Sequence, residues 1–265
     1  MYSPEEANMV TEKFEPQHHV EIAASTIIGT RKYQQDSYGC VEDAGGCLAV
    51  VCDGMGGLEG GEKASGLSIG TILEDYLSLP INDYREFLYN EAVKLDELVY
   101  NIKDPNGNLL GAGTTIVAVH IQDGRIHWLS VGDSKIYVLR NNEMKCIVRE
   151  HNYRMILDEM LAAGKITQEQ YTIEDVKGDA LTSFLGIGNV SLIDISEAPA
   201  QLMTGDIILL CSDGVYKSLS DDKIQAVVTD NYFDLQRAAD ELTDSALRYS
   251  GRGQDNTTVV LVKYV

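Results

Sequence analysis

The chain has 265 residues, of which 44% are hydrophobic and 23% charged, proportions that indicate a soluble globular protein rather than a disordered or fibrous one. Acidic side chains outnumber basic ones by 41 to 21, and the resulting formal charge of −20 repels nucleic acid and anionic membrane surfaces. We therefore expect no nucleic-acid partner and no membrane partner.

Two further features concern the compartment. No segment holds the roughly 18 apolar residues of a membrane-spanning helix, and the N-terminus has no basic-plus-apolar signal. The five cysteines are an odd number and lie mostly in or beside apolar segments, which favours a reducing compartment over a disulfide framework. A cytoplasmic protein is expected, with its cysteines as small core residues.

The first third of the chain predicts a tail, three strands and two helices. Residues 1–19 are expected to form a flexible tail, and strands are predicted at 20–28 and 37–41. The apolar run at 48–52 indicates a buried strand that delivers Asp53 to its end, where Gly54 leaves room beside the carboxylate. Two amphipathic helices follow, one ending at Pro80 and one capped by Asn82 or Asp83, and they are expected to pair across a sheet.

The remainder alternates strands with a second group of helices. A meander of strands is predicted at 114–122, 126–131, 135–140 and 144–149, with Asp123-Gly124 as a hairpin turn. A helix at 152–163 and a polar excursion to 189 form a flap segment, 152–189. Strands at 190–195 and 206–211, helices at 220–229 and 233–249, and a closing strand at 257–265 complete the chain. Because no βαβ alternation occurs, residues 20–265 are expected to form one α+β layered sandwich.

Four acidic residues share a placement at strand ends: Asp53, Asp133, Asp213 and Asp255. If these ends converge, the carboxylates repel one another unless a cation lies among them, and hard oxygen ligands favour magnesium, manganese or calcium. Taken singly, each Asp-Gly pair is better interpreted as a turn, as Asp123-Gly124 is. The chain lacks the EF-hand, thiolate-phosphatase, P-loop and His-Glu-x-x-His patterns, which disfavours those chemistries.

Six short motifs, in order, resemble the metal-dependent protein phosphatases, the protein phosphatase 2C or PPM family, in their compact bacterial form. They are GTRKYQQD at 29–36, VCDGMGG at 51–57, GTT at 113–115, VGDS at 131–134, CSDGV at 211–215 and QDNTT at 254–258. The resemblance covers everything except the N-terminal tail. It implies a four-layer αββα sandwich of two mainly antiparallel sheets flanked by paired antiparallel helices.

The resemblance also implies the roles of particular residues. Two manganese or magnesium ions would be bridged by Asp53, with Asp36 and the Gly54 carbonyl on one side and Asp213 and Asp255 on the other. Asp133 matches a ligand of a third, weaker ion that it shares with Asp213. Arg31 matches the residue that holds the substrate phosphate, which its planar fork of donors suits.

The implied activity is hydrolysis of phosphoserine and phosphothreonine in proteins, with a metal-bridging water as the nucleophile. Met55 stands where animal members carry a histidine that is a candidate general acid, so leaving-group protonation is expected to fall to water. The implied partners are phosphoproteins and a cognate Ser/Thr kinase, and a monomer is expected. Two alternatives stay open: a catalytically silent relative that acts as a binding module, and a non-enzymatic divalent-cation binder.

Overall fold

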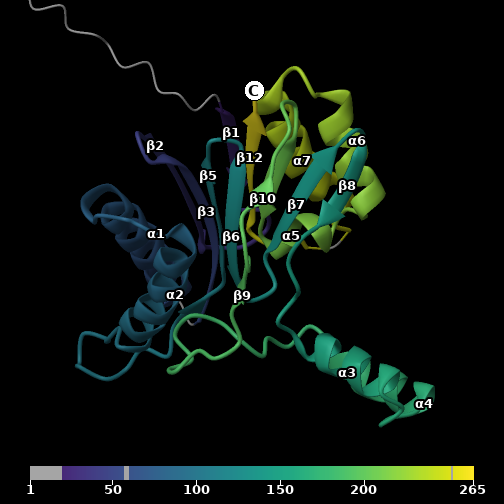
Figure 1. The fold of residues 1–265 in the computed structure, drawn as a ribbon. Helices are drawn as coiled ribbons and strands as arrows, with labels where there is room; N and C mark the ends of the chain where they lie inside the picture. The colour runs from purple at the N-terminus through teal and green to yellow at the C-terminus, as the bar shows by residue number, and fades with distance from the viewer. Residues whose placement is uncertain (1–19, 57–59, 252) are drawn as a thin grey trace, which may run out of the picture.

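The computed structural model describes residues 20–56, 60–251 and 253–265, so the tail predicted at 1–19 lies outside the described residues. Two β-sheets pack face to face; the α1–α2 pair covers the outer face of one, and α6 and α7 cover the outer face of the other (Figure 1). Every strand pairing is antiparallel. The predicted α+β four-layer sandwich is confirmed.

The first sheet has the order β10-β6-β5-β3-β2, with β4 paired to β3 and β9 to β6. It is covered by α1 (Gly60–Ser78) and α2 (Tyr84–Tyr100), and Asp83 caps α2 through its side chain. The strands are β2 (Asp36–Asp43), β3 (Gly46–Met55), β4 (Gly113–Thr114), β5 (Ile116–Gln122), β6 (Arg125–Val131), β9 (Asp194–Ile195) and β10 (Ala200–Gln201).

The second sheet has the order β1-β12-β11-β7-β8. It joins the first strand of the described chain to the last, because β1 pairs with β12 along its whole length. Its strands are β1 (Val20–Ile27), β7 (Lys135–Arg140), β8 (Glu143–Cys146), β11 (Ile207–Cys211) and β12 (Thr257–Tyr264), and the helices beside it are α5 (Asp213–Tyr216), α6 (Asp221–Asp230) and α7 (Leu235–Tyr249).

Strand β3 is buried on both faces, which explains its unbroken apolar run. Leu48, Val50 and Cys52 face the core beneath α1 and α2, whereas Ala49 and Val51 face the core between the sheets. All five side chains are fully buried. The strand is therefore a rigid support for Asp53, which follows Cys52.

The predictions fail mainly in the flap. Residues 164–189 contain two helical segments that periodicity did not indicate, α4 (Gln168–Glu174) and the 3-10 helix η1 (Asp175–Lys177). Thr167 and Gln170 form a capping box at the start of α4, a signal that the sequence analysis overlooked. With α3 (Tyr153–Ala162) they extend away from the sandwich (Figure 1). The strand predicted at 190–195 is reduced to the two residues of β9.

Two smaller points concern turns and cysteines. Asp123 and Gly124 both have positive φ, 51° and 69°, so the predicted hairpin turn is confirmed. All five cysteines are free; Cys146 is exposed, so it is not the core residue that was expected. Among the helices of the described residues, none combines the length and the apolar character that a membrane span requires.

Candidate metal centre

Asp36 and Asp53 lie opposite each other on the paired strands β2 and β3. Asp36 is buried, with 7% of its surface exposed. Its Oδ2 accepts a hydrogen bond from Ser212 Oγ, and the two atoms are 2.7 Å apart. Ser212 Oγ in turn accepts the backbone N–H of Thr258 at 2.9 Å. The Asp36 carboxylate of the first sheet is therefore fixed to the second sheet through the residue that follows β11.

The backbone around Asp53 is held on two sides. Its N–H donates to Thr115 Oγ1 at 3.0 Å, and its carbonyl accepts the Thr115 N–H at 2.8 Å. At Gly54, an added Cβ would lie 2.2 Å from the Gly61 carbonyl oxygen and 2.6 Å from that of Gln35. Glycine is therefore required here for the start of α1 and the end of the Arg31 loop to approach β3.

Asp213 and Asp133 come from two other connections. Asp213 is the first residue of the short helix α5, not the last of a strand, and Lys217 Nζ contacts its Oδ2 at 2.5 Å. Asp133, 5% exposed, lies in the loop between β6 and β7. Buried His151 fixes that loop, since its Nδ1 accepts the Gly132 N–H at 3.2 Å and its own N–H donates to the Gly132 carbonyl at 2.8 Å.

Arg31 lies on a loop that docks against the approach to β12. Gly29, at φ 62°, lies so near this segment that an added Cβ would be 2.4 Å from the Asp255 carbonyl oxygen. Asn256 donates to the carbonyls of Ile28 and Tyr33, both at 3.0 Å, and accepts the N–H of Gln35 at 2.9 Å. These bonds place the Arg31 guanidinium 2.5 Å from Asp255 Oδ2.

The structure brings every predicted site residue except Asp36 to one cavity of about 310 Å³. Asp36 does not line this cavity but pairs with Asp53 across β2 and β3. The predicted site residues that line it are Arg31, Asp53, Gly54, Asp133, Asp213 and Asp255. Lys217 also lines the cavity, and the sequence did not lead us to predict it. Its position four residues after Asp213 could have indicated it, because side chains at this spacing meet on a helix. Asp179 and Leu181 reach the cavity from the base of the flap.

The carboxylates perturb one another strongly. Burial, followed by repulsion from Asp36 and Asp213, holds the pKa of Asp53 well above its ordinary value. Burial and the neighbouring carboxylates raise the pKa of Asp36 to about 7, although the Ser212 hydroxyl opposes this change. For Asp133, burial and Asp213 raise the pKa to about 6 against the attraction of Lys217. Such mutual repulsion is what a bound cation relieves.

The donor atoms fit a divalent cation. Asp36 Oδ1 and Asp213 Oδ1 are buried and have no hydrogen-bond partner among the described residues. An unpaired buried anionic oxygen is costly, and oxygen-only donors select magnesium or manganese over zinc. No three His, Cys, Asp or Glu side chains of the described ranges already form a metal-holding group. Arg31 and Lys217 form ion pairs with Asp255 and Asp213 in this structure.

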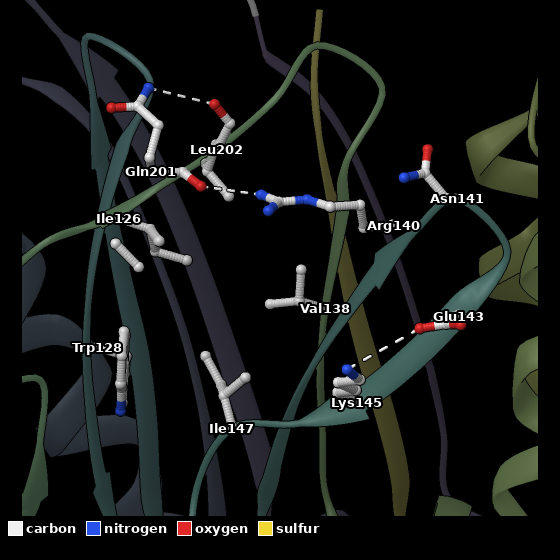
Figure 2. A pocket seen from close by; sticks show the side chains of 11 residues that line it. Ile126, Trp128, Val138, Arg140, Asn141, Glu143, Lys145, Ile147, Gln201 and Leu202 are labelled. Carbon is white, nitrogen blue, oxygen red and sulfur yellow. Dashed lines mark hydrogen bonds and ion pairs between the residues drawn. The ribbon is translucent and has the colours of Figure 1, made fainter.

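A second cavity, of about 410 Å³, has a different character (Figure 2). It lies between β6 and the β7–β8 hairpin, and Ile126, Val138 and Ile147 form its apolar wall. Arg140 spans it and donates to the Gln201 carbonyl at 2.8 Å. Since Glu143 is its one acidic side chain, this cavity cannot offer the oxygen cluster that a phosphate-hydrolysing metal site needs.

A family profile described as protein phosphatase 2C matches residues 26–248 of the chain. The chain belongs to the protein phosphatase 2C family. The family expected from the six motifs is thereby confirmed, and so is the enzyme class, a protein phosphatase.

Similar proteins support this assignment to the phosphatase 2C family over almost the whole length of this chain. A serine/threonine phosphatase Stp from Listeria welshimeri is 26% identical over 238 residues, which cover 88% of this chain and 91% of the relative. The solved serine/threonine phosphatase of S. agalactiae superposes with a TM-score of 0.81 at 27% identity, covering 93% of this chain and 100% of the other. The catalytic domain of the phosphatase PstP, solved with two manganese ions, gives a TM-score of 0.75 at 27% identity and covers 93% and 98%.

Proposed function

We propose that this phosphatase 2C protein hydrolyses phosphoserine and phosphothreonine in proteins, with manganese or magnesium as its cofactor. The observation that carries the proposal is the cavity where Arg31 and carboxylates from both sheets come together, with Asp213 Oδ1 buried and without a hydrogen-bond partner among the described residues. The names of the relatives, which are serine/threonine phosphatases, and the two manganese ions of PstP support it.

In this proposal Asp36, Asp53, Asp213, Asp255 and the Gly54 carbonyl would hold the ions. When bound, the ions supply a strongly acidified water and neutralise the charge of the phosphate. Arg31 leaves its ion pair with Asp255 and binds the phosphate oxygens with its fork of N–H donors. Met55, which also lines the cavity, cannot transfer a proton, so water protonates the leaving alkoxide, which departs as the free hydroxyl.

We also propose that the protein acts in the cytoplasm as a monomer, on phosphoproteins of a cognate Ser/Thr kinase. The five free cysteines suit a reducing compartment. The chain has 41 acidic and 21 basic residues, and this negative net charge does not suit a polyanionic partner. The base of the flap, with Asp179 and Leu181 at the cavity, is placed to contact the polypeptide around a phosphorylated residue.

The direct test is hydrolysis of p-nitrophenyl phosphate and of a phosphothreonine peptide with manganese, with EDTA, and by Asp213→Asn. We expect turnover with manganese, none with EDTA, and a loss of about 100-fold or more in the variant, because an amide is a poor ligand for the ion. Asp244→Asn, an exposed position on α7, is the matched control and should keep wild-type turnover.

A metal-loaded wild type with no turnover above Asp213→Asn would exclude the enzyme and favour the silent binding module. If neither protein bound manganese, the cation-binder alternative would fall as well.

A further inference from the structure

Lys217 lies between two carboxylates of the cavity. Its Nζ is 2.5 Å from Asp213 Oδ2 and 3.9 Å from Asp133 Oδ2. Both carboxylates are largely buried, with side-chain exposures of 14% for Asp213 and 7% for Asp133. Two buried anions this close need a counter-charge, and the Lys217 ammonium provides it.

The fold holds Lys217 in this position. Lys217 follows α5, and its N–H bonds the Asp213 carbonyl at 3.0 Å, which puts its side chain one helical turn from that of Asp213. The neighbouring Tyr216 donates its hydroxyl to the Asp133 carbonyl at 3.0 Å. The Lys135 ammonium lies 4.0 Å from the centre of the Tyr216 ring and forms an ion pair with Glu150 at 2.7 Å. The turn carrying Lys217 is thus fixed to the loop carrying Asp133.

The two oxygens of Asp213 have different partners. Oδ2 contacts Lys217, whereas Oδ1 is buried and has no partner among the described residues. Elsewhere in the cluster, no Lys or Arg of the described residues forms an ion pair with Asp36 or Asp53. The carboxylate cluster is therefore uneven: among the described residues, the Asp133–Asp213 pair has a Lys ammonium as its ion-pair partner, and the Asp36–Asp53 pair has none.

Lys217 forms ion pairs with both carboxylates of the pair, Asp213 and Asp133. A fixed positive charge at this distance from both carboxylates repels a divalent ion that approaches the same pair.

We propose that the Lys217 ammonium is a built-in cation for the Asp133–Asp213 pair, so that the chain takes up two divalent ions and not three. Asp213 Oδ1 then serves the two-ion centre, and Asp133 has Lys217 as its partner instead of a metal. The inference rests on the proposed function, because it presumes that manganese binds at Asp53.

The test is calorimetric titration of manganese into metal-stripped wild type, Lys217→Met, Lys217→Arg and the control Lys145→Met. Lys145 is 77% exposed and pairs only with exposed Glu143 among the described residues. We expect two ions per chain for wild type, Lys217→Arg and the control, and three for Lys217→Met. Adding Asp133→Asn to Lys217→Met should return the number to two.

A second variant keeps the test independent of how well Lys217→Met folds. Asp133→Asn alone, with circular dichroism to confirm its fold, should still bind two ions with dissociation constants within about threefold of wild type. Loss of an ion in Asp133→Asn, or two ions in a folded Lys217→Met, overturns the proposal. If either outcome occurs while wild type binds two ions and hydrolyses phosphopeptide, the inference about Lys217 fails and the proposed function stands. A wild type that takes up no manganese and hydrolyses nothing contradicts the proposed function too.

Discussion

Asp53 is unusual because it combines burial with four carboxylate neighbours. Burial and repulsion from Asp36, Asp213, Asp133 and Asp255 all raise its pKa. A charge in this setting destabilises the metal-free fold, and only the gain from a cation offsets that cost. In the proposed metal centre, Asp53 would therefore serve binding at the expense of stability, which is common at functional sites.

Replacing Asp53 with Asn should therefore separate function from stability. We expect EDTA-treated Asp53→Asn to be as stable as wild type or more so in urea denaturation, because the repulsion disappears while the shape is kept. Hydrolysis of p-nitrophenyl phosphate should be abolished. A metal-free variant that unfolds well before wild type would show instead that Asp53 is a structural hydrogen-bond acceptor.

Asp36 gives the metal-free protein a characteristic pH dependence. Burial raises its pKa to about 7 in the fold, above the ordinary value of 3.8, so the folded state binds a proton between these pH values that the unfolded chain does not. Stability in EDTA should accordingly rise by about 1 kcal/mol from this group as the pH falls from 8 to 6. Urea denaturation at both pH values checks this, and Asp36→Asn should lack that increment. An equal increment in the variant would contradict the assignment.

At the scale of elements, the Arg31 loop depends on the segment before β12. Asn256, 5% exposed, makes three hydrogen bonds to the loop between β1 and β2. Its amide thus connects the residue that would bind phosphate to the strand end that supplies Asp255. The loop owes its shape to this contact, because it contains no helix or strand of its own.

Asn256→Ala should cost about 2–3 kcal/mol of unfolding free energy, since each buried hydrogen bond contributes about 1 kcal/mol. The Michaelis constant for a phosphopeptide should rise as well, because Arg31 loses its fixed position. Asn101→Ala, which removes an exposed side-chain bond to the Glu97 carbonyl, is the control and should change stability by less than about 0.5 kcal/mol. Equal losses in the two variants would mean that the loop is held by other contacts.

The elements also show which patterns the sequence could reveal. The apolar run before Asp53 and the stripes of α1, α2 and α7 predicted their elements, because burial imposes a period on the side chains. Helix α4 has no buried residue, so no stripe marks it, and only its Thr167–Gln170 cap could have. Strand β9 pairs with β6 over just two residues, too short for any pattern to indicate.

For the molecule as a whole, the site joins the two sheets. Asp36 and Asp53 belong to the first sheet, whereas Asp213 follows β11 and Asp255 precedes β12 of the second. Residues more than 200 positions apart meet because β1 pairs with β12. The sequence indicated which carboxylates end strands, but it could not place the cations Arg31 and Lys217 on particular carboxylates, because that depends on tertiary packing.

The central claim is that carboxylates from both sheets hold the ions that drive phosphate ester hydrolysis. The most direct measurement counts manganese ions bound per chain by equilibrium dialysis and records phosphothreonine-peptide hydrolysis on the same samples, for wild type and Asp53→Asn. Two bound ions and turnover in wild type, with both lost in Asp53→Asn, is the predicted result. Manganese-dependent turnover that persists in Asp53→Asn would contradict the account.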